Sequence, residues 1–163
     1  MPQYLLSTQT IVDIAKRDGS APEQWLAHAR QSDQQIDEAD IFISAVSHAQ
    51  ITRLIERLPR DADREALRQA VEAFVQRMDD LGQIVPVTKG IADAWGLLLG
   101  MSLTYTNSQN VEGQFSSGER LVMATAIKGT AGRPYVLVAR TQAAYTALQA
   151  VGLVLEDPYL TFS

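Results

Sequence analysis

Three polar residues, Ser7 to Gln9, follow directly after a short apolar run that begins at Tyr4. Helical spacing of apolar residues resumes at Ile11, so the pattern predicts a first strand that leads into a first helix. In an α/β protein with a parallel sheet, functional groups lie on the loops at the carboxyl ends of the strands. Ser7, Thr8 and Gln9 are therefore the first candidates for a functional site.

The elements that must position these residues alternate along the chain between strands and helices. Apolar runs predict three further strands, over residues 41–46, 135–139 and 153–155, and residues 84–87 are either a short strand or an extended connector. Amphipathic or buried-helix patterns predict later helices, over residues 23–34, 47–58, 63–78, 88–99, 116–127 and 142–150. This alternation predicts an α/β fold with a central, mostly parallel sheet of about five strands and helices on both faces.

Capping signals predict where three of the helices begin. Ser47 and Thr88 each precede a helical pattern and carry a hydroxyl that can accept a backbone N–H hydrogen bond. Ser116, with Glu119 three residues later, has the spacing of a capping box, in which each side chain bonds the other residue's backbone. Glu119 thus has a structural interpretation from the outset.

Two stretches between the predicted strands are distinctive. The helices over 47–58 and 63–78 are adjacent in the chain and are expected to pack as a helical hairpin. The stretch Thr104–Gly118 is polar, contains glycine and lacks periodicity. A loop of that length is usually either functional or disordered.

Composition limits the class of protein. The chain has 163 residues, 46% of them apolar, which predicts a single domain over 1–163 with one packed core. It contains no cysteine, which excludes disulfides and thiolate zinc sites. We find no run long enough for a membrane span and no signal-peptide pattern, so we expect a cytoplasmic protein that does not associate with membranes.

The charge pattern does not favour a nucleic-acid-binding surface. The formal net charge is −5, which is unlike a surface that binds phosphate over its whole area. The densest basic series alternates with acidic residues, which is typical of a solvated, salt-bridged helix face. Its members are Arg53, Arg57, Arg60, Arg64 and Arg68.

Six segments, in this order and spacing, resemble the PIN domains of the VapC and FitB type, the endoribonuclease toxins of bacterial toxin–antitoxin pairs. The likeness covers nearly the whole chain and implies a three-layer α/β/α fold. Tyr4–Gln9 is similar to the family's first strand with its Leu-Asp-Thr-Asn end, and Ile43–Gln50 to its Ile-Ser-X-Val-Thr-X-Ala-Glu segment. The other matching segments are Ile84–Val87 with Ala92–Trp95, Glu119–Ala126, Val136–Thr141 and Val154–Pro158.

The resemblance also implies which positions carry chemistry. PIN nucleases hold one or two Mg²⁺ or Mn²⁺ ions with about four acidic residues from separate loops, and the metal activates water for phosphodiester cleavage. In this chain Ser7, Gln50 and Thr141 stand at three of those positions, and Glu119 replaces an aspartate at the fourth. The site is therefore degenerate with respect to the family pattern.

The chemical consequence follows from the residue types. Ser7, Gln50 and Thr141 are neutral, so the four positions together offer one formal negative charge to a dication. Mg²⁺ prefers anionic oxygen ligands, and two-metal catalysis needs several carboxylates. Gln50 also donates hydrogen bonds, which suits a pocket joined by direct side-chain contacts. We therefore expect weak metal binding at Glu119, if any, and no cofactor.

Several other candidates remain open. Glu119 is either only the capping partner of Ser116 or also a metal ligand. Asp13, on the first predicted helix, could point back into the pocket and partly compensate for the lost charge. By the resemblance Arg140 lies at the pocket rim, where it could face phosphate or pair with Glu119. We expect Asp93 to face solvent, and His28 and His48 to be isolated rather than catalytic.

Three functions compete. The first is a non-catalytic protein that keeps the binding surfaces of a toxin. We then expect it to bind an antitoxin-like protein and to form a homodimer, and RNA binding is not favoured. The alternative is an active Mg²⁺- or Mn²⁺-dependent endoribonuclease whose rearranged site uses Glu119, Asp13 and a loop acid such as Glu112. The third is a small-molecule pocket lined by neutral hydrogen-bonding groups at the strand ends.

Overall fold

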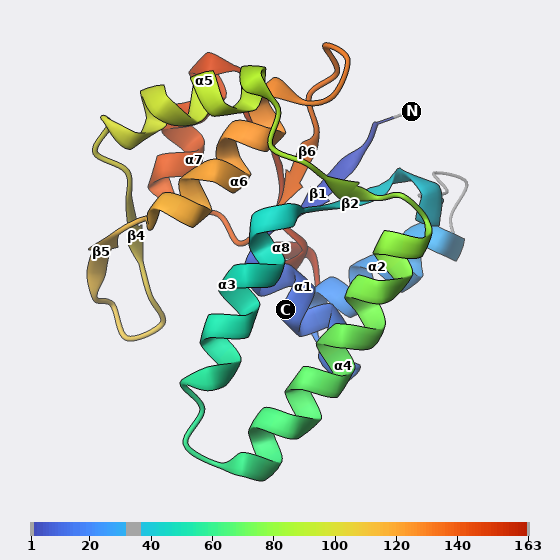
Figure 1. Ribbon diagram of the computed structural model, residues 1–163. Helices are drawn as coiled ribbons and strands as arrows, with labels where there is room; N and C mark the ends of the chain where they lie inside the picture. The colour runs from blue at the N-terminus through green and yellow to red at the C-terminus, as the bar shows by residue number, and fades with distance from the viewer. Residues whose placement is uncertain (1, 32–36, 163) are drawn as a thin grey trace.

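Five short strands form the single parallel sheet around which the protein is built (Figure 1). The computed structural model describes residues 2–31 and 37–162. The strand order is β3-β2-β1-β6-β7, and Leu5 at the centre pairs with Phe42 on one side and Leu137 on the other. The strands are β1 (Tyr4–Leu6), β2 (Ile41–Ser44), β3 (Ile84–Val85), β6 (Val136–Val138) and β7 (Val154–Glu156). This confirms the predicted parallel sheet.

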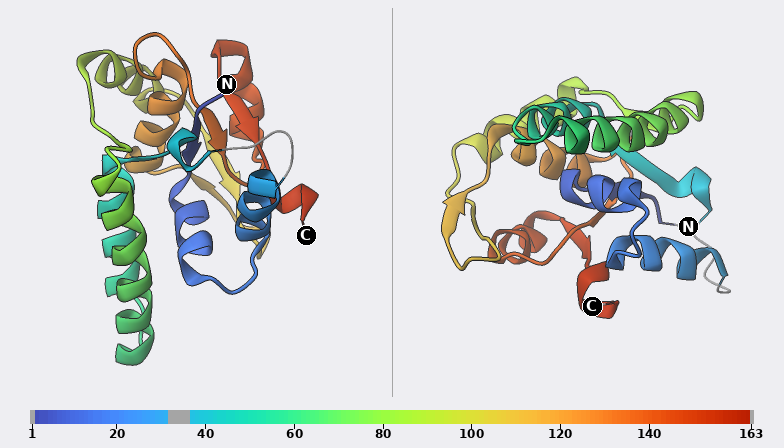
Figure 2. Two further views of the ribbon diagram at one scale, coloured as in Figure 1. Left: turned by 90° about the vertical axis from the view of Figure 1, so that its right-hand side faces the viewer. Right: turned by 90° about the horizontal axis from the view of Figure 1, so that it is seen from below.

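Helices cover both faces of the sheet, which confirms the three-layer α/β/α fold (Figure 2). Side chains alternate along β1, so Tyr4 and Leu6 join a core with α1–α4, whereas Leu5 joins a core with α5–α7. The helices are α1 (Thr8–Lys16), α2 (Ala21–Gln31), α3 (Ala45–Glu56), α4 (Asp61–Asp80), α5 (Lys89–Leu99), α6 (Ser117–Lys128), α7 (Ala143–Leu148) and α8 (Pro158–Thr161). Short 3₁₀ turns span Glu38–Asp40 and Gln149–Val151.

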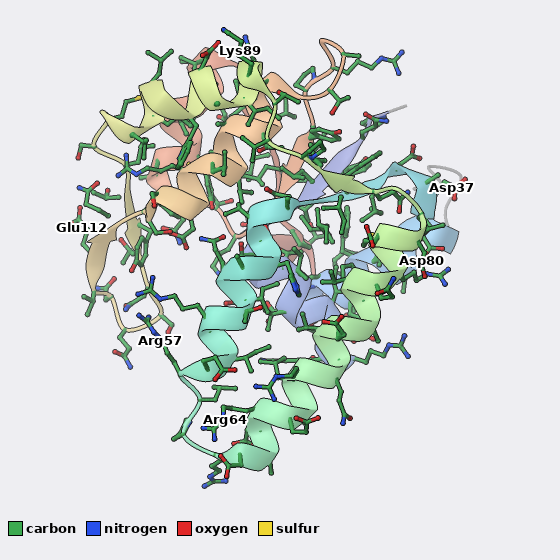
Figure 3. The ribbon with its side chains drawn as sticks, viewed as in Figure 1. Asp37, Arg57, Arg64, Asp80, Lys89 and Glu112 are labelled. Carbon is green, nitrogen blue, oxygen red and sulfur yellow. The ribbon has the colours of Figure 1, made fainter. Side chains whose placement is uncertain are left out.

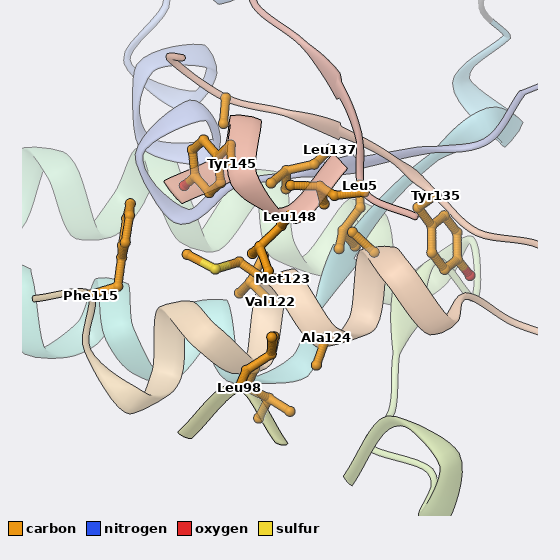
Figure 4. Packing of buried hydrophobic residues seen from close by; sticks show 14 of the residues in the cluster. Leu5, Leu98, Phe115, Val122, Met123, Ala124, Tyr135, Leu137, Tyr145 and Leu148 are labelled. Carbon is orange, nitrogen blue, oxygen red and sulfur yellow. The ribbon is translucent and has the colours of Figure 1, made fainter. Parts of the chain in front are cut away.

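The core on the α5–α7 face fixes the floor of the site described below. Leu5, Leu137 and Leu148 are fully buried in it, together with most of α6 (Figure 4). Each such leucine contributes about 1.5–3 kcal/mol relative to an exposed one. Because residues 120–126 of α6 are buried in this core, the helix is fixed relative to the sheet.

Helices α3 and α4 form the predicted helical hairpin, which projects well beyond the sheet (Figures 1 and 2). Arg68 on α4 bonds Glu56 at 2.8 Å and Glu65 at 2.9 Å, and Arg64 pairs with Asp61. Arg57 and Arg64 lie toward the turn between the two helices (Figure 3). For Arg64 and Arg68 this confirms the salt-bridged face.

The predicted start of the helix at Ser47 is wrong. Helix α3 begins at Ala45 because Ser44 is its N-cap, and the Ser44 side chain accepts from the Val46 N–H at 3.3 Å. The strand before it is correspondingly shorter than predicted. Ser47 is completely buried inside the helix, where its hydroxyl lies 3.3 Å from that of Thr8. Thr88 and Ser116 do cap their helices.

The stretch Thr104–Gly118 contains an antiparallel hairpin where only an aperiodic loop was expected. Strands β4 (Thr104–Thr106) and β5 (Glu112–Gln114) pair, and the Asn107 side chain accepts from the backbone of Gln109 and Val111 at 2.9 Å to close the turn. Three-residue polar strands give too short a pattern to recognise from periodicity. Residues 105–108 of this hairpin line one side of the cleft described below.

Two further departures from the sequence-based expectations concern the helices α2 and α8. Helix α2 ends at Gln31 in the described part of the chain, and residues 32–34 of the predicted helix lie outside it. Helix α8 was not predicted, although Pro158 occupies its first turn, a position that proline favours. In the described ranges 2–31 and 37–162, no helix has the length and apolar character needed to cross a membrane.

Candidate functional site

A cleft of about 760 Å³ opens at the carboxyl ends of β1 and β6. The start of α1, the β4–β5 hairpin, α6, the loop after β6 and α7 contribute its walls. Its lining is of mixed polarity and includes three aromatic rings, Tyr105, Phe115 and Tyr145, in consecutive contact with centroids 5.2 and 5.3 Å apart. Its charged lining residues are Asp13, Glu119 and Arg140.

Ser7 lines this cleft, and its hydroxyl is committed to the start of α1. Ser7 Oγ accepts from the Thr10 N–H at 3.3 Å and lies 2.8 Å from the Thr10 hydroxyl. Thr10, which is completely buried, donates its hydroxyl to the Val138 carbonyl at 2.9 Å. The residue at the first of the four positions implied by the resemblance therefore works as an N-cap that ties α1 to β6.

Gln50 joins three helices at the edge of the cleft. Thr8 Oγ1, on α1, donates to Gln50 Oε1 at 2.7 Å, and Gln50 Nε2 donates to Ser116 Oγ, the N-cap of α6, at 3.4 Å. Gln50 itself is not among the lining residues of the cleft. Both the oxygen and the nitrogen of its amide are therefore hydrogen-bonded to other protein groups.

Glu119 lines the cleft and forms the predicted capping box. Its Oε2 accepts from the Ser116 N–H at 2.9 Å and from Ser116 Oγ at 3.1 Å, and its own N–H donates to Ser116 Oγ at 3.2 Å. The capping interpretation is confirmed. Burial and, secondarily, the charge of Glu119 raise the pKa of Tyr145 above its ordinary value, so the phenol beside this carboxylate is a neutral hydrogen-bonding group.

Thr141 bonds a carboxylate that the sequence did not single out. Its N–H and its hydroxyl both donate to Asp157 Oδ2, at 2.7 and 2.6 Å. Asp157 lies at the end of the neighbouring strand β7, and its Oδ1 caps α8 by accepting from the Tyr159 N–H at 2.9 Å. The Asp-Pro pair at a helix start was the available sequence signal. Thr141 is not among the cleft-lining residues.

Asp13 lines the cleft, but two side chains already bind it. Tyr159 Oη donates to Asp13 Oδ2 at 2.5 Å, and Gln9 Nε2 donates to Oδ1 at 3.0 Å. Burial and then Asp13 raise the pKa of Tyr159, whereas Thr10 and Arg140 act in the opposite direction. Tyr159 was not identified as a site residue from the sequence.

Arg140 stacks on Tyr159 instead of pairing with Glu119. Its Cζ lies 4.1 Å from the centre of the Tyr159 ring, a cation–π contact. Within the described residues, no ion pair joins Arg140 to Glu119. Arg140 is nevertheless exposed and lines the cleft, so its guanidinium remains available to an anionic group.

The remaining candidates lie away from the cleft. Asp93 is exposed and pairs with Lys89 at 2.8 Å, as expected of a solvent-facing residue. Glu112 lies on the exposed hairpin (Figure 3). His28 contacts the Phe162 ring at 5.7 Å, and His48 lines a small cavity between α3 and α4. None of the four lines the cleft.

The donor set does not match a site with four acidic ligands. Among residues 2–31 and 37–162, no group of three or more histidine, aspartate or glutamate side chains is placed to hold a metal ion. At the four positions implied by the resemblance, the side chains of Ser7, Gln50, Glu119 and Thr141 bond other protein groups. The arrangement is a hydrogen-bonded cleft of mixed polarity.

Comparison with known proteins finds similarity in structure alone. No protein-family model and no curated protein sequence matches the chain. The crystal structure of FitAcB from Neisseria gonorrhoeae matches with a TM-score of 0.65 and 16% identity over 96% of this chain and 99% of that one. The crystal structure of VapBC2 from Rickettsia felis bound to a DNA fragment from their promoter matches with a TM-score of 0.64 and 15% identity over 94% of this chain and 97% of that one.

A third structure, DNA-bound VapBC from Salmonella typhimurium, gives a TM-score of 0.59 and 14% identity over 97% of this chain and 99% of that one. These matches extend over nearly the full length of both chains in each comparison. At such low identities the likeness establishes the fold alone. The chain has the PIN-domain-like fold of the FitB and VapC type.

Proposed function

We propose that this protein is a non-catalytic relative of the PIN-domain toxins, which binds a protein partner and does not cleave RNA by a metal-dependent reaction. One observation carries the proposal: three of the four positions expected to be acidic hold neutral residues with internal partners. Gln50 represents the case best, because both ends of its amide are bonded to protein groups. A glutamate at position 50 would place a carboxylate oxygen next to Ser116 Oγ, where the amide N–H of Gln50 now donates a hydrogen bond.

The metal requirement supports the same conclusion. Mg²⁺ and Mn²⁺ bind oxygen ligands, usually several carboxylates with retained waters, and phosphodiester cleavage needs the ion to activate water. Glu119 is the one carboxylate at the four positions, and it serves the helix cap. Because the remaining ligands would be neutral, the dication would lose hydration without a matching gain in charge. No cofactor is therefore expected.

Isothermal calorimetry with Mn²⁺ tests this proposal without a known substrate. The wild type and Glu119→Gln should both show no heat of binding at millimolar Mn²⁺, and neither should cleave single-stranded RNA. Micromolar binding that disappears in Glu119→Gln would overturn the proposal. Thr52→Ala, an exposed change on α3 away from the cleft, provides a matched control for handling and folding.

A groove beside the cleft supports the protein-binding half of the proposal. Helices α1, α3 and α4 line a groove of about 600 Å³ whose contacts are mostly apolar, among them Val12, Leu54, Leu58 and Leu67. Leu54 is 38% exposed there. An amphipathic segment can lay its apolar face into such a groove. Since the structural neighbours FitAB and VapBC are two-component complexes, we propose a small antitoxin-like protein as the occupant.

Leu54→Asp tests this groove, because it places an uncompensated charge on an apolar contact. The partner to test is a small protein encoded next to this chain's gene, co-expressed and co-purified with it. We expect Leu54→Asp to reduce the affinity for that partner at least tenfold in calorimetry. Leu160→Asp, on exposed α8, is the control. Equal affinities of the wild type and Leu54→Asp would place the partner elsewhere.

A homodimer is proposed on a different surface. Leu97 is 77% exposed on α5, and Met101, four residues later in the chain, is also exposed. Apolar groups clustered in this way mark interaction surfaces. We expect the wild type to sediment as a dimer and Leu97→Asp as a monomer in analytical ultracentrifugation. A monomeric wild type would contradict this.

One observation favours the alternative of an active endoribonuclease. Asp13 and Glu119 line the same cleft, and the Asp157 carboxylate lies against Thr141, at a position where the resemblance implies an acid. An active enzyme would need Mg²⁺ or Mn²⁺ and would lose cleavage in both Asp13→Asn and Glu119→Gln. Absence of cleavage by the wild type with Mn²⁺ across varied RNA sequences would remove this alternative.

A further inference from the structure

Four polar side chains in series connect the start of α1, the middle of α3 and the start of α6 at the edge of the cleft. Thr8 donates to Gln50, Gln50 donates to Ser116, and Ser116 lies within hydrogen-bonding distance of the Glu119 carboxylate. The links measure 2.7, 3.4 and 3.1 Å. Residues on α1, α3 and α6 are thereby joined without a charged group at the centre.

The carboxylate sets the direction of every bond in this series. An ionised Glu119 accepts only, so Ser116 must donate its single hydroxyl proton to it. Ser116 Oγ can then only accept from its other neighbours, the Glu119 N–H and Gln50 Nε2. The nitrogen of the Gln50 amide must face Ser116, its oxygen must face Thr8, and Thr8 must donate.

We infer that Gln50 is a positioning residue whose amide, through Ser116, holds Glu119 and the first turn of α6 in place. The amide is required because position 50 must accept on one side and donate on the other. A carboxylate there would compete with Glu119 for the one Ser116 proton. The inference rests on the proposed function, which it deepens by stating how the site is held together without a cation.

Gly118 supplies a second, independent observation for this role. A Cβ added to Gly118 would lie 2.5 Å from Gln50 Nε2 and 2.9 Å from its Cδ. The Gln50 amide therefore packs directly on the backbone of the first turn of α6. Only a residue without a side chain leaves room for it there.

A double-substitution cycle tests the direction of the series. Gln50→Glu alone should lower the melting temperature by about 3–6 °C, because Ser116 Oγ loses the Nε2 group that donates to it. Glu119→Gln alone should lower it less, since glutamine also completes a capping box. In the double variant the polarity is reversed, with a carboxylate at 50 and an amide at 119. The melting temperature of the double variant should be at least about 3 °C higher than the value obtained by adding the two single changes to that of the wild type.

The same cycle in a Ser116→Ala background separates this coupling from plain charge repulsion. Without the hydroxyl, the effects of Gln50→Glu and Glu119→Gln should add. Equal coupling in both backgrounds would overturn the inference. If Gln50→Glu does not fold, Gln50→Met replaces it, and faster hydrogen exchange of the Glu119 amide relative to the amides of α5 is the expected result. Unchanged exchange at Glu119 would also overturn it.

Failure of this inference is distinguishable from failure of the proposed function. Wild-type binding of Mn²⁺ in calorimetry contradicts the proposed function, and it can be measured without any variant at position 50. Additive effects of the two substitutions contradict only the role of Gln50. The unfolding experiments are therefore done in the presence of a chelator, so that an adventitious ion does not contribute.

Discussion

Tyr159, on the last helix, donates its hydroxyl to Asp13 Oδ2 on the first helix at 2.5 Å, across 146 residues of sequence. The bond places the C-terminal segment against the cleft and occupies a carboxylate that could otherwise face a ligand. Arg140 stacks on the ring of the same tyrosine. Tyr159, which lies outside the four positions implied by the resemblance, therefore contacts two of the three charged residues of the cleft.

Tyr159→Phe should change how stability depends on alkaline pH. Burial and then Asp13 raise the pKa of Tyr159, so the folded state holds the phenol proton more tightly than the unfolded state. That contribution is fully present below about pH 10, the ordinary value, and is lost as the pH rises further. The melting temperature of Tyr159→Phe should therefore fall less steeply than that of the wild type above about pH 10.

Some alkaline dependence should remain in that variant, because burial also raises the pKa values of Tyr4 and Tyr145. Asp13→Asn is the matched comparison, since it removes the second cause and keeps the phenol. It should reduce the slope only in part. Identical slopes in the wild type and in Tyr159→Phe would contradict the role given to Tyr159.

Arg120→Met should be strongly destabilising although it removes no acidic partner. Arg120 is 6% exposed, and its guanidinium donates to the carbonyls of Leu98, Met101 and Phe115 at 2.7, 2.5 and 2.9 Å. The substitution leaves buried carbonyls without donors, which costs about 2–4 kcal/mol in the free energy of unfolding. Urea unfolding measures this, and exposed Arg57→Met should stay within about 0.5 kcal/mol of the wild type.

Gly129→Ala should cost more stability than Gly19→Ala, although both glycines have positive φ. An added Cβ at Gly129 would lie 1.6 Å from the Arg133 carbonyl oxygen, whereas at Gly19 nothing lies within 4 Å. Gly19→Ala should therefore cost only the left-handed strain of about 1–2 kcal/mol. Thermal unfolding of the two variants gives the comparison, and equal losses would contradict a close approach at Gly129.

Ser7→Asp/Gln50→Glu should gain affinity for Mn²⁺ if these positions face a common point with Glu119. Aspartate is a good N-cap, so the first change keeps the start of α1. The pair adds two carboxylates to the existing one, and calorimetry should show binding of Mn²⁺ at concentrations where the wild type shows none. Addition of Mn²⁺ should also raise the melting temperature of this variant. No gain in either measurement would mean that the three positions do not converge.

The sequence by itself determined the features that depend on near neighbours in the chain. The Ser116–Glu119 capping box and the Thr88 cap were predicted because their partners lie three residues apart, on one turn. The parallel sheet was predicted because its buried strands are continuous apolar runs that alternate with helical patterns. The neutral character of Ser7 was also visible, since residue type alone gives charge.

Only the tertiary structure decided which polar groups meet. Helix α3 begins at Ala45, with Ser44 as its N-cap, rather than at Ser47, and the β4–β5 hairpin forms from strands too short to give a pattern. Gln50 bonds Thr8 across 42 residues, and Tyr159 bonds Asp13 across 146. Such pairs depend on the packing of distant elements, which residue spacing along the chain does not encode.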